Sequence, residues 1–430
     1  MENPRELALK SLIKTDTQSV FSNLEINTAL ERAKLNSSDR GLYTALYLGV
    51  LEKRIALDYI ISKYSKIQLD QIDVETLNVL RLGIYQLYYM DKIPDYSATD
   101  ESVSLAPKKS KGFVNAIIRS FIRDGKSVAF PKEKWQGVSV EYSYPMEIIE
   151  LFIRSYGEAV TYDLITGSEN EKATSLRVNT LKTSVHDIKD SLIAREDKPI
   201  VLFDIIKTTL PIRDIKDLID TGMVFVQDEA SRICTRVVNA RPNDVILDAC
   251  ACPGGKTFSM SIDMENKGKV LSCDLHANKL SLIDKGAKRL GLDIVETKEQ
   301  NGKEYNEELN QKFDKVLCDV PCSGLGIIFK KPDIKYKPID NINNLPNVQY
   351  DILSNCSKYV KVGGEMIYST CTLNKEENEN NVLRFLSEND NFEALDFEID
   401  EIKSENGMYT FMPHINKTDG FFVAKMKRVK

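Results

Sequence analysis

The sequence predicts a multidomain protein with an all-α N-terminal domain (1–130), a small α/β module (143–239) and a doubly wound α/β domain (240–430). A length of 430 residues suggests two to four domains. Apolar side chains recur at helical spacing through the first domain. Beyond Asp244, short apolar runs that end in polar or glycine-rich turns alternate with helical stretches, which is typical of α/β sheets.

Composition excludes several classes of protein. Hydrophobic residues make up 42% and charged residues 28%, which argues against a largely disordered, collagenous or coiled-coil chain. No apolar run approaches the roughly 18 residues that span a bilayer, and the charged start MENPRELALK has no signal-peptide core. We therefore expect a cytoplasmic monomer with no membrane partner. The eight cysteines are then reduced thiols rather than a disulfide framework.

Helical periodicity justifies the first domain. Leu77, Leu80, Ile84 and Leu87 lie on one helical face, and Pro94 prevents continuation. A second helix carries apolar residues at the same spacing: Val114, Ile117, Ile118, Phe121 and Ile122.

Charge is distributed unevenly, so the net charge of −6 hides two opposite poles. The window 105–134 holds eight basic and two acidic residues, whereas 376–405 holds eleven acidic and two basic ones. A basic stripe beside an apolar helix face is often only solvated, but the lysines just before this helix favour a phosphate-binding surface. The candidate RNA-contacting residues are Lys108, Lys109, Lys111, Arg119 and Arg123, with Lys330, Lys331, Lys335 and Lys337 further along.

The middle of the chain gives weaker patterns. Residues 131–145 are predicted to be a linker that contains the only tryptophan, Trp135. A helix is expected at Met146–Tyr156 and short strands at Ser175–Val178 and Met223–Gln227. In the third domain, five strands are expected: Val245–Leu247, Val270–Cys273, Lys315–Cys318, Glu365–Tyr368 and Phe421–Lys425.

A glycine turn after the first of these strands predicts a ligand site. Gly254 and Gly255 let a ligand approach the backbone, and the following helix start supplies unpaired N–H donors. A phosphate-cradling P-loop needs glycine where Cys250 stands, and a dinucleotide G-x-G-x-x-G is absent. The third possibility is an adenosyl ligand without a pyrophosphate, namely S-adenosylmethionine.

Two polar residues strengthen that interpretation. Asp274 ends the second strand, where an acid accepts hydrogen bonds from both ribose hydroxyls. It can also cap the helix that begins near His276. Asn301 falls in the turn after a third strand, where it could bind the adenine edge.

Two later strands end in cysteines that suit pyrimidine methylation. Cys322 follows Asp319 in a Pro/Gly turn, and Cys371 ends the next strand, so both should face the carboxyl edge of the sheet. Carbon 5 of a pyrimidine is a poor nucleophile, and a thiolate that adds to carbon 6 activates it. An acid near ring nitrogen 3 stabilises the charge that develops there. A second thiol can assist release. A free thiol is mostly protonated at neutral pH, so Lys256 or a helix N-terminus must stabilise the thiolate form of the cysteine.

Other roles for the cysteines were weighed. A cysteine at a strand end is often a small buried hydrophobe. Zinc is disfavoured because strict C-x-x-C pairs are missing and only three histidines exist, and no histidine is well placed for papain-like catalysis. We therefore expect no metal. The cysteines interpreted as structural are Cys234, Cys250, Cys252, Cys273, Cys318 and Cys356.

Three motifs resemble the signatures of RNA cytosine-5 methyltransferases. They are Asp248-Ala-Cys-Ala-Cys-Pro-Gly-Gly-Lys-Thr257, Asp319-Val-Pro-Cys-Ser-Gly-Leu-Gly326 and Tyr368-Ser-Thr-Cys-Thr372. The segments around Ser38–Arg40, Leu80–Leu87 and Lys111–Arg119 are similar to a NusB-like helical RNA-binding domain. The resemblance implies a Rossmann-like methyltransferase domain preceded by a small RNA-recognition module.

The resemblance also implies roles for single residues. Cys371 would be the nucleophile, Cys322 would assist product release and Asp319 would contact the target base. The cofactor site would comprise Cys250, Ala251, Cys252, Pro253, Gly254, Gly255, Lys256, Asp274, Asn301 and Asp319. The family usually has aspartate at the position of Asn301 and alanine at that of Cys252; the second change should be silent.

The resemblance implies methyl transfer from S-adenosylmethionine to carbon 5 of a cytidine in 16S ribosomal RNA. The cytidine must be flipped out or lie in a loop, because its ring is out of reach inside a duplex. The same chemistry on transfer RNA or large-subunit ribosomal RNA stays open. So does a non-catalytic RNA-binding protein, although the intact cysteines argue against it.

Overall fold

The computed structural model describes residues 3–18, 20–167 and 173–430. The chain divides into two compact units, one formed by residues 1–166 and 328–337 and the other by 167–327 and 338–430. The limits of the three functional modules (1–130, 143–239, 240–430) remain a prediction. Among the described residues, no helix is both long and apolar enough to cross a bilayer.

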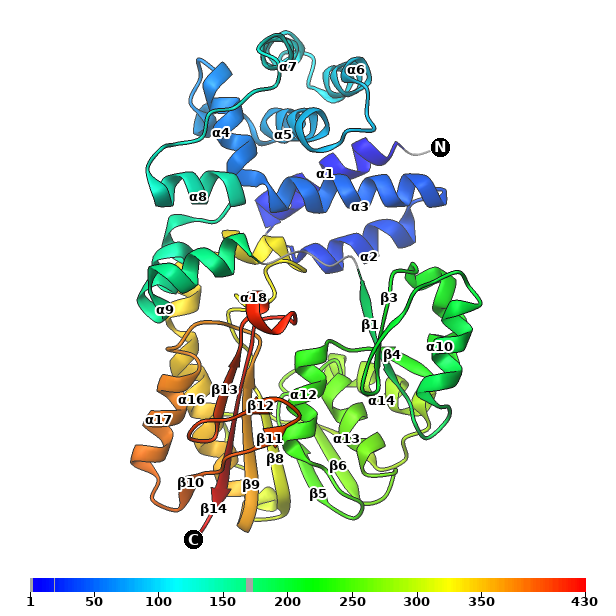
Figure 1. Cartoon of the computed structure of the whole chain (residues 1–430), viewed down its shortest axis with the longest axis vertical. Coiled ribbons are helices and arrows are strands. Elements are labelled where there is room, and N and C mark those ends of the chain that lie inside the picture. The colour runs from blue at the N-terminus through cyan, green and yellow to red at the C-terminus, as the bar shows by residue number, and fades with distance from the viewer. Residues whose placement is uncertain (1–2, 19, 168–172) are drawn as a thin grey trace. The chain divides into compact units, whose positions relative to one another are not determined.

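The first unit is helical, as the sequence predicts (Figure 1). Its α-helices are α1 (Pro4–Gln18), α2 (Ser22–Arg32), α3 (Ser37–Glu52), α4 (Arg54–Tyr64), α5 (Val74–Tyr89), α6 (Asp95–Leu105), α7 (Lys111–Arg123), α8 (Lys134–Tyr142) and α9 (Met146–Thr166). One apolar core joins α1 to α7, with side chains such as Leu12, Leu46, Leu80 and Phe121 almost wholly buried.

Helix α7 has the two faces that the sequence predicts. Val114, Ile117, Ile118 and Phe121 are buried, and Ile122 is half-buried. The basic side chains Lys108, Lys109, Arg119 and Arg123 are exposed, and Lys111 is half-exposed. Arg119 donates to Asn115 and Arg123 donates to Ser120 of the same helix, and both arginines are exposed, so the cationic stripe faces solvent.

The predicted linker at 131–145 is wrong, because residues 134–142 form α8. Glu133 caps this helix by accepting hydrogen bonds from the backbone N–H groups of Trp135 and Gln136. Val138 and Val140 are buried. The carboxylate cap and the short buried apolar patch stabilise a helix here, although prolines flank the segment on both sides. Helix α9 extends beyond the predicted Tyr156, through non-helical backbone at Gly157.

Residues 328–337 follow the Cys322 loop in sequence but belong to the helical unit. Here Asp333 accepts a hydrogen bond from Ser22 of α2. Lys335 is buried, its Nζ lies 2.9 Å from the carbonyl oxygen of Glu52, and burial lowers its pKa to about 7. The expectation that Lys335 lines an RNA path is therefore wrong. Lys330 is exposed and Lys331 is half-buried.

The second unit contains a small antiparallel sheet and a large mixed sheet. The small sheet has the order β2-β3-β1-β4, and sequence analysis identified only β1 and β4. Its elements are β1 (Thr174–Val178), α10 (Val185–Ile193), β2 (Ile200–Leu202), β3 (Ile205–Thr208), α11 (Lys216–Asp220) and β4 (Val224–Val226).

The large sheet has the order β10-β14-β9-β8-β5-β6-β7, and β13 also pairs with β14. Strands β9, β8, β5, β6 and β7 are parallel, whereas β14 runs antiparallel to β9. Its strands are β5 (Val245–Asp248), β6 (Lys269–Asp274), β7 (Val295–Glu299), β8 (Phe313–Asp319), β9 (Val360–Thr370), β10 (Phe392–Ala394), β13 (Met408–Phe411) and β14 (Phe421–Arg428).

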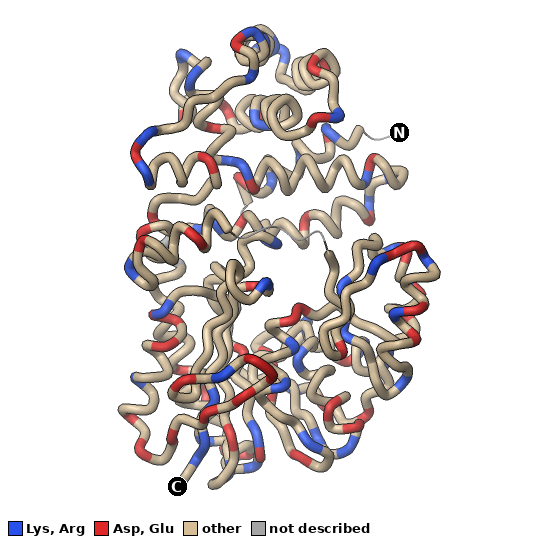
Figure 2. The backbone as a smooth tube through the Cα atoms, viewed as in Figure 1, with Lys and Arg blue, Asp and Glu red and all other residues tan. Residues whose placement is uncertain are grey.

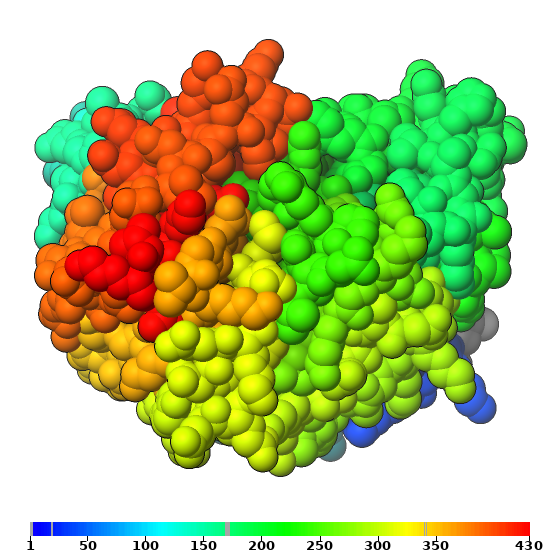
Figure 3. All heavy atoms as spheres, turned by 90° about the horizontal axis from the view of Figure 1, so that it is seen from below, coloured from blue at the N-terminus to red at the C-terminus, as the bar shows by residue number. Residues whose placement is uncertain are grey.

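Helices alternate with these strands, which confirms the doubly wound architecture. They are α12 (Glu229–Val238), α13 (Gly255–Asp263), α14 (Ala277–Leu290), α15 (Ile339–Asn343), α16 (Leu345–Cys356), α17 (Glu379–Glu388) and α18 (Pro413–Asn416). Figure 3 shows the red C-terminal segment against orange segments of the chain, in agreement with the pairing of β14 with β9 and β10.

Part of the acidic window 376–405 lies on a hairpin of this unit. The hairpin of β11 (Glu398–Ile399) and β12 (Ile402–Lys403) carries Asp400 and Glu401. Figure 2 shows acidic positions gathered on this hairpin. This part of the acidic window lies outside the strands that carry the catalytic motifs.

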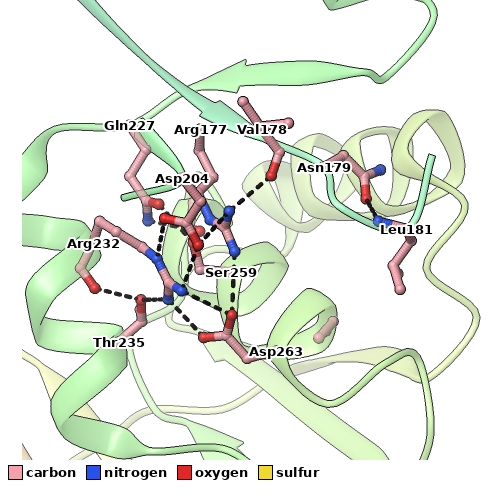
Figure 4. Close-up of polar contacts among 12 residues, drawn as sticks. Arg177, Val178, Asn179, Leu181, Asp204, Gln227, Arg232, Thr235, Ser259 and Asp263 are labelled. Carbon is pink, nitrogen blue, oxygen red and sulfur yellow. Dashed lines mark hydrogen bonds and ion pairs between the residues drawn. The ribbon is translucent and has the colours of Figure 1, made fainter. Parts of the chain in front are cut away.

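A buried ion network connects the small sheet with the large one (Figure 4). Arg177 of β1 and Arg232 of α12 both contact Asp204 and Asp263, at N–O distances of 2.6–3.2 Å. Arg177 is 1% exposed, and burial together with the Arg232 charge lowers its pKa to about 10. Two cations and two carboxylates neutralise one another, which makes burial of the four charges tolerable.

Candidate active site

The two predicted catalytic cysteines meet at the carboxyl edge of the large sheet. Strands β8 and β9 are parallel neighbours, with Asp319 opposite Ser369 in the register. The loops that follow them carry Cys322 and Cys371, whose sulfur atoms lie 3.2 Å apart. Neither cysteine forms a disulfide, and both side chains are half-buried. The juxtaposition expected from the strand order is therefore present.

Asp319 is held by two donors. Lys256 Nζ lies 2.6 Å from its Oδ2, and Ser369 Oγ donates to its Oδ1 at 2.8 Å. Burial alone would lower the pKa of Lys256, but the Asp319 carboxylate outweighs it and the pKa is raised. The charge of Cys371 acts in the same direction. Lys256 is therefore a permanent cation beside Asp319, and its field favours a thiolate at Cys371.

The two cysteines differ electrostatically. The hydrogen bond with Cys371 raises the pKa of Cys322, and burial and the charges of Cys371 and Glu377 raise it further. Cys322 is thus kept as a thiol, while Cys371 is the sulfur that influences the Lys256 ammonium group.

The glycine turn forms the start of α13. Gly254 has φ +108°, and a Cβ added there would lie 2.5 Å from the Phe258 ring, so glycine is required. Helix α13 begins at Gly255, next to Lys256, and leaves its first N–H groups free of helical partners. Half-buried Cys250 and Cys252 and buried Ala251 line the preceding turn, with Pro253 exposed.

This turn fits an adenosyl group better than a nucleoside triphosphate. Lys256 is paired with Asp319, and Thr257 Oγ1 contacts Asp248 Oδ2 and Ser272 Oγ, so neither side chain is free for phosphate or magnesium. Among the described residues, the buried Oδ1 of Asp248 has no hydrogen-bond partner. Burial raises the pKa of Asp248 to about 7.

Asp274 and Asn301 end neighbouring strands at the same edge. Asp274 Oδ1 accepts the backbone N–H of His276, but His276 is the N-cap of α14 and, among the described residues, no side chain caps that helix, so the suggested N-cap role of Asp274 is wrong. Asn301 accepts the N–H of Lys303 and donates to Glu304, so both ends of its amide serve the local turn. Their contacts with a cofactor remain predictions.

The other cysteines lie apart from the thiol pair or deep in the core. Cys273, Cys318 and Cys356 are buried. Cys234 is also fully buried, but it lies beside the site: burial raises its pKa to about 12, while the Lys256 charge opposes this. The described residues contain no group of three or more potential metal ligands.

Sequence reasoning missed the residues that hold the loops together. Ser369, two residues before Cys371 in its motif, orients Asp319. Ser323 and Glu377 join the two cysteine loops. The alternation of residues along β9 could have indicated Ser369, because i and i+2 share a face of the strand. Nothing in the local pattern distinguishes Glu377 from its acidic neighbours.

Gly326 is the point where three motif segments touch. Its N–H donates to the Cys371 carbonyl at 3.0 Å, and its own carbonyl accepts the N–H of Gly420 at 2.9 Å. A Cβ at Gly326 would lie 2.0 Å from the Gly420 oxygen.

We expect Gly326→Ala to lower turnover at least about tenfold and to lower the melting temperature, because the backbone must move to make room for the methyl group. Gly41→Ala, at a site with open space, should change neither. If both variants had the same turnover and the same melting temperature, the steric clash expected at Gly326 would be contradicted.

Comparison with known proteins agrees with this geometry. Residues 235–427 match the model of the family described as 16S rRNA methyltransferase RsmB/F, and residues 2–123 match the NusB family. The chain is 32% identical over 441 residues to the probable ribosomal RNA small subunit methyltransferase B of Bacillus subtilis, covering 99% of this chain and 98% of that protein. It is 30% identical to the Synechocystis protein of the same name, with full coverage of both.

Solved structures share the fold. The crystal structure of PH0851 covers 100% of this chain and 99% of that chain, with a TM-score of 0.84 and 23% identity. NSun6 from Pyrococcus horikoshii, solved with SFG, covers 67% of this chain and 99% of that one, with a TM-score of 0.60 and 22% identity. The chain therefore belongs to the 16S rRNA methyltransferase RsmB/F family, carries an N-terminal domain of the NusB family, and is an S-adenosylmethionine-dependent methyltransferase.

Proposed function

We propose that this chain methylates carbon 5 of a cytidine in 16S ribosomal RNA through a covalent adduct between Cys371 and carbon 6. The observation that carries the proposal is the convergence of Cys371, Cys322, Asp319 and Lys256 at the ends of β8 and β9 and the start of α13. Thiolate, thiol, carboxylate and ammonium are the groups that activation of a pyrimidine ring requires.

Cys371 is the nucleophile. The nearby Lys256 cation favours its thiolate, whereas Cys322 is kept as a thiol. Attack on carbon 6 moves electron density toward nitrogen 3 of the cytosine ring. The Lys256–Asp319 pair can place a proton next to this nitrogen and so stabilise the developing charge. Carbon 5 thereby becomes nucleophilic.

The cofactor cradle comprises the glycine turn, the start of α13 and the strand ends that carry Asp274 and Asn301. S-adenosylmethionine, when bound, supplies an electrophilic methyl group. The cradle residues are Cys250, Ala251, Cys252, Pro253, Gly254, Gly255, Lys256, Asp274, Asn301 and Asp319. The unpaired N–H groups of α13 and the unpartnered Oδ1 of Asp248 support a polar ligand beside this turn.

Cys322 assists release. After methyl transfer, a base removes the proton on carbon 5, and the electron pair re-forms the ring double bond as the bond between carbon 6 and Cys371 breaks, so the departing sulfur carries negative charge. A thiol 3.2 Å away can donate a hydrogen bond to it and stabilise that charge. The raised pKa of Cys322 keeps the required proton in place.

The proposed identity of the RNA substrate can be tested directly in cells. Bisulfite sequencing of total RNA, with and without the gene, should show one methylated cytidine in 16S ribosomal RNA that disappears on deletion. Disappearance of a signal in transfer RNA or large-subunit RNA instead would refute the proposed substrate while leaving the chemistry intact.

The exposed lysines before α7 should bind RNA phosphates. We expect Lys108→Gln with Lys109→Gln to weaken RNA binding and to reduce the slope of log K against log salt by roughly 1.4–1.8, about 0.7–0.9 for each lost phosphate contact. The matched control replaces the exposed Lys66 and Lys92 of the same unit. Filter binding across a salt series measures both slopes. An unchanged slope in the first variant would mean that the basic segment is merely solvated.

A further inference from the structure

Glu377 is a buried carboxylate between the two cysteine loops. It lies six residues after Cys371, in the turn that precedes α17, and its exposure is 0%. Among the described residues, the Glu377 carboxylate forms no ion pair with a lysine, arginine or histidine. Instead, neutral donors surround it, which is the way a protein holds a buried negative charge in a fixed position.

Four donors saturate the two oxygens of Glu377. Ser323 donates twice, from its backbone N–H at 2.9 Å and from its Oγ at 2.6 Å. The side-chain amides of Gln349 and Asn374 donate at 2.8 and 3.0 Å. Since every partner donates, both oxygens act purely as acceptors, as in an ionised carboxylate.

These donors come from both catalytic loops. Ser323 directly follows Cys322, and Asn374 stands three residues after Cys371. Ser323 Oγ also contacts Thr372 Oγ1 at 2.7 Å, which adds a second link beside Cys371. Glu377 therefore fastens the residue next to one sulfur to the loop of the other.

Gln349 of α16 also links Glu377 to the Cys322 loop. The same amide nitrogen that donates to Glu377 also lies 3.0 Å from the carbonyl oxygen of Pro321. The residues on both sides of Cys322 are thereby fixed to one buried centre. Tyr368 adds a further link, since its hydroxyl donates to the backbone carbonyl of Glu377.

The charge of Glu377 also acts on Cys322. It is among the causes that raise the pKa of this thiol, after the hydrogen bond with Cys371 and burial. The ionisable groups in this surrounding are Cys371, Glu377 and Tyr368. Cys371, in contrast, interacts electrostatically with the Lys256 cation.

We propose that Glu377 is a positioning residue that holds Cys322, as a thiol, against Cys371 for the release step. The proposal rests on the two-cysteine chemistry proposed above. Without Glu377 as a pure acceptor, the Cys322 loop separates from the Cys371 loop. Attack by Cys371 continues, but the departing sulfur loses its donor, so the covalent RNA intermediate should accumulate.

The test compares Glu377→Gln with Glu376→Gln, its exposed neighbour. In Glu377→Gln, an NH₂ group replaces one acceptor oxygen, so donor groups of Ser323 and Gln349 face another donor. With a 16S ribosomal RNA transcript and S-adenosylmethionine, we expect at least tenfold more RNA–protein adduct on a denaturing gel than for wild type. The KM for S-adenosylmethionine should stay within about twofold, and kcat should fall. Glu376→Gln should resemble wild type in all three measurements.

Two further variants keep the inference falsifiable. Ser323→Ala removes one donor and should give an intermediate amount of adduct even if Glu377→Gln does not fold. Adding Glu377→Gln to Cys322→Ala should not increase the adduct beyond that of Cys322→Ala alone. A folded Glu377→Gln protein that loses turnover without adduct, or no adduct in Ser323→Ala, would overturn the inference. Absence of adduct from Cys322→Ala itself would instead overturn the proposed release chemistry.

Discussion

Cys371→Ala should abolish methyl transfer, with a loss of about a thousandfold or more, because no other thiolate can replace the nucleophile. Cys322, whose sulfur lies 3.2 Å from that of Cys371, does not substitute, since burial and the charge of Glu377 still act to raise its pKa when Cys371 is absent. Tritium transfer from labelled S-adenosylmethionine to a 16S ribosomal RNA transcript measures the loss. Cofactor affinity should remain nearly unchanged, because the cradle is built by β5 and α13 rather than by the end of β9.

The matched control is Cys356→Ala, which removes a buried thiol of the same domain that lies outside the proposed site. Folded Cys356→Ala protein should keep its turnover. Residual turnover of Cys371→Ala above a tenth of wild type would contradict its assignment as the nucleophile. A loss in folded Cys356→Ala protein as large as in Cys371→Ala would point to a general effect of thiol removal.

Cys322→Ala should stop the reaction at a later stage. Attack and methyl transfer proceed, but the departing sulfur has lost the thiol that stabilises it, so an RNA–protein adduct persists. A denaturing gel should show a band of protein crosslinked to RNA that depends on S-adenosylmethionine. In the double variant with Cys371→Ala, the band should vanish, because the bond to RNA is made by Cys371. A folded, cofactor-binding Cys322→Ala protein without this band would refute the release role.

Much of the large sheet could be predicted because its strands are short apolar runs. Val245–Leu247 and Phe421–Lys425 lie within the observed β5 and β14, and the strand ends lead directly to the motif residues. Parallel strands end at one edge, so the order of β8 and β9 alone brings Cys322 and Cys371 together. Motif and topology were therefore sufficient to predict the thiol pair.

Features that depend on distant partners could not be predicted. Lys335 looks like any surface lysine in the sequence, and only the Glu52 carbonyl and the ring of Tyr144, far away in the chain, explain its burial. Exposed β2 (Ile200–Leu202) carries too few buried residues to give a pattern. Glu377 sits in an acidic stretch, and its difference from Glu376 arises entirely from donors in other segments.

The central claim is that Cys371, rather than Cys322, bonds to the target ring, and an RNA that contains 5-fluorocytidine tests it most directly. Fluorine at carbon 5 cannot leave as a proton does, so the covalent intermediate is trapped in the wild-type enzyme. After nuclease and protease digestion, mass spectrometry should locate the methylated fluoropyrimidine on the peptide that contains Cys371. Attachment to Cys322, or no attachment with an active enzyme, would contradict the account.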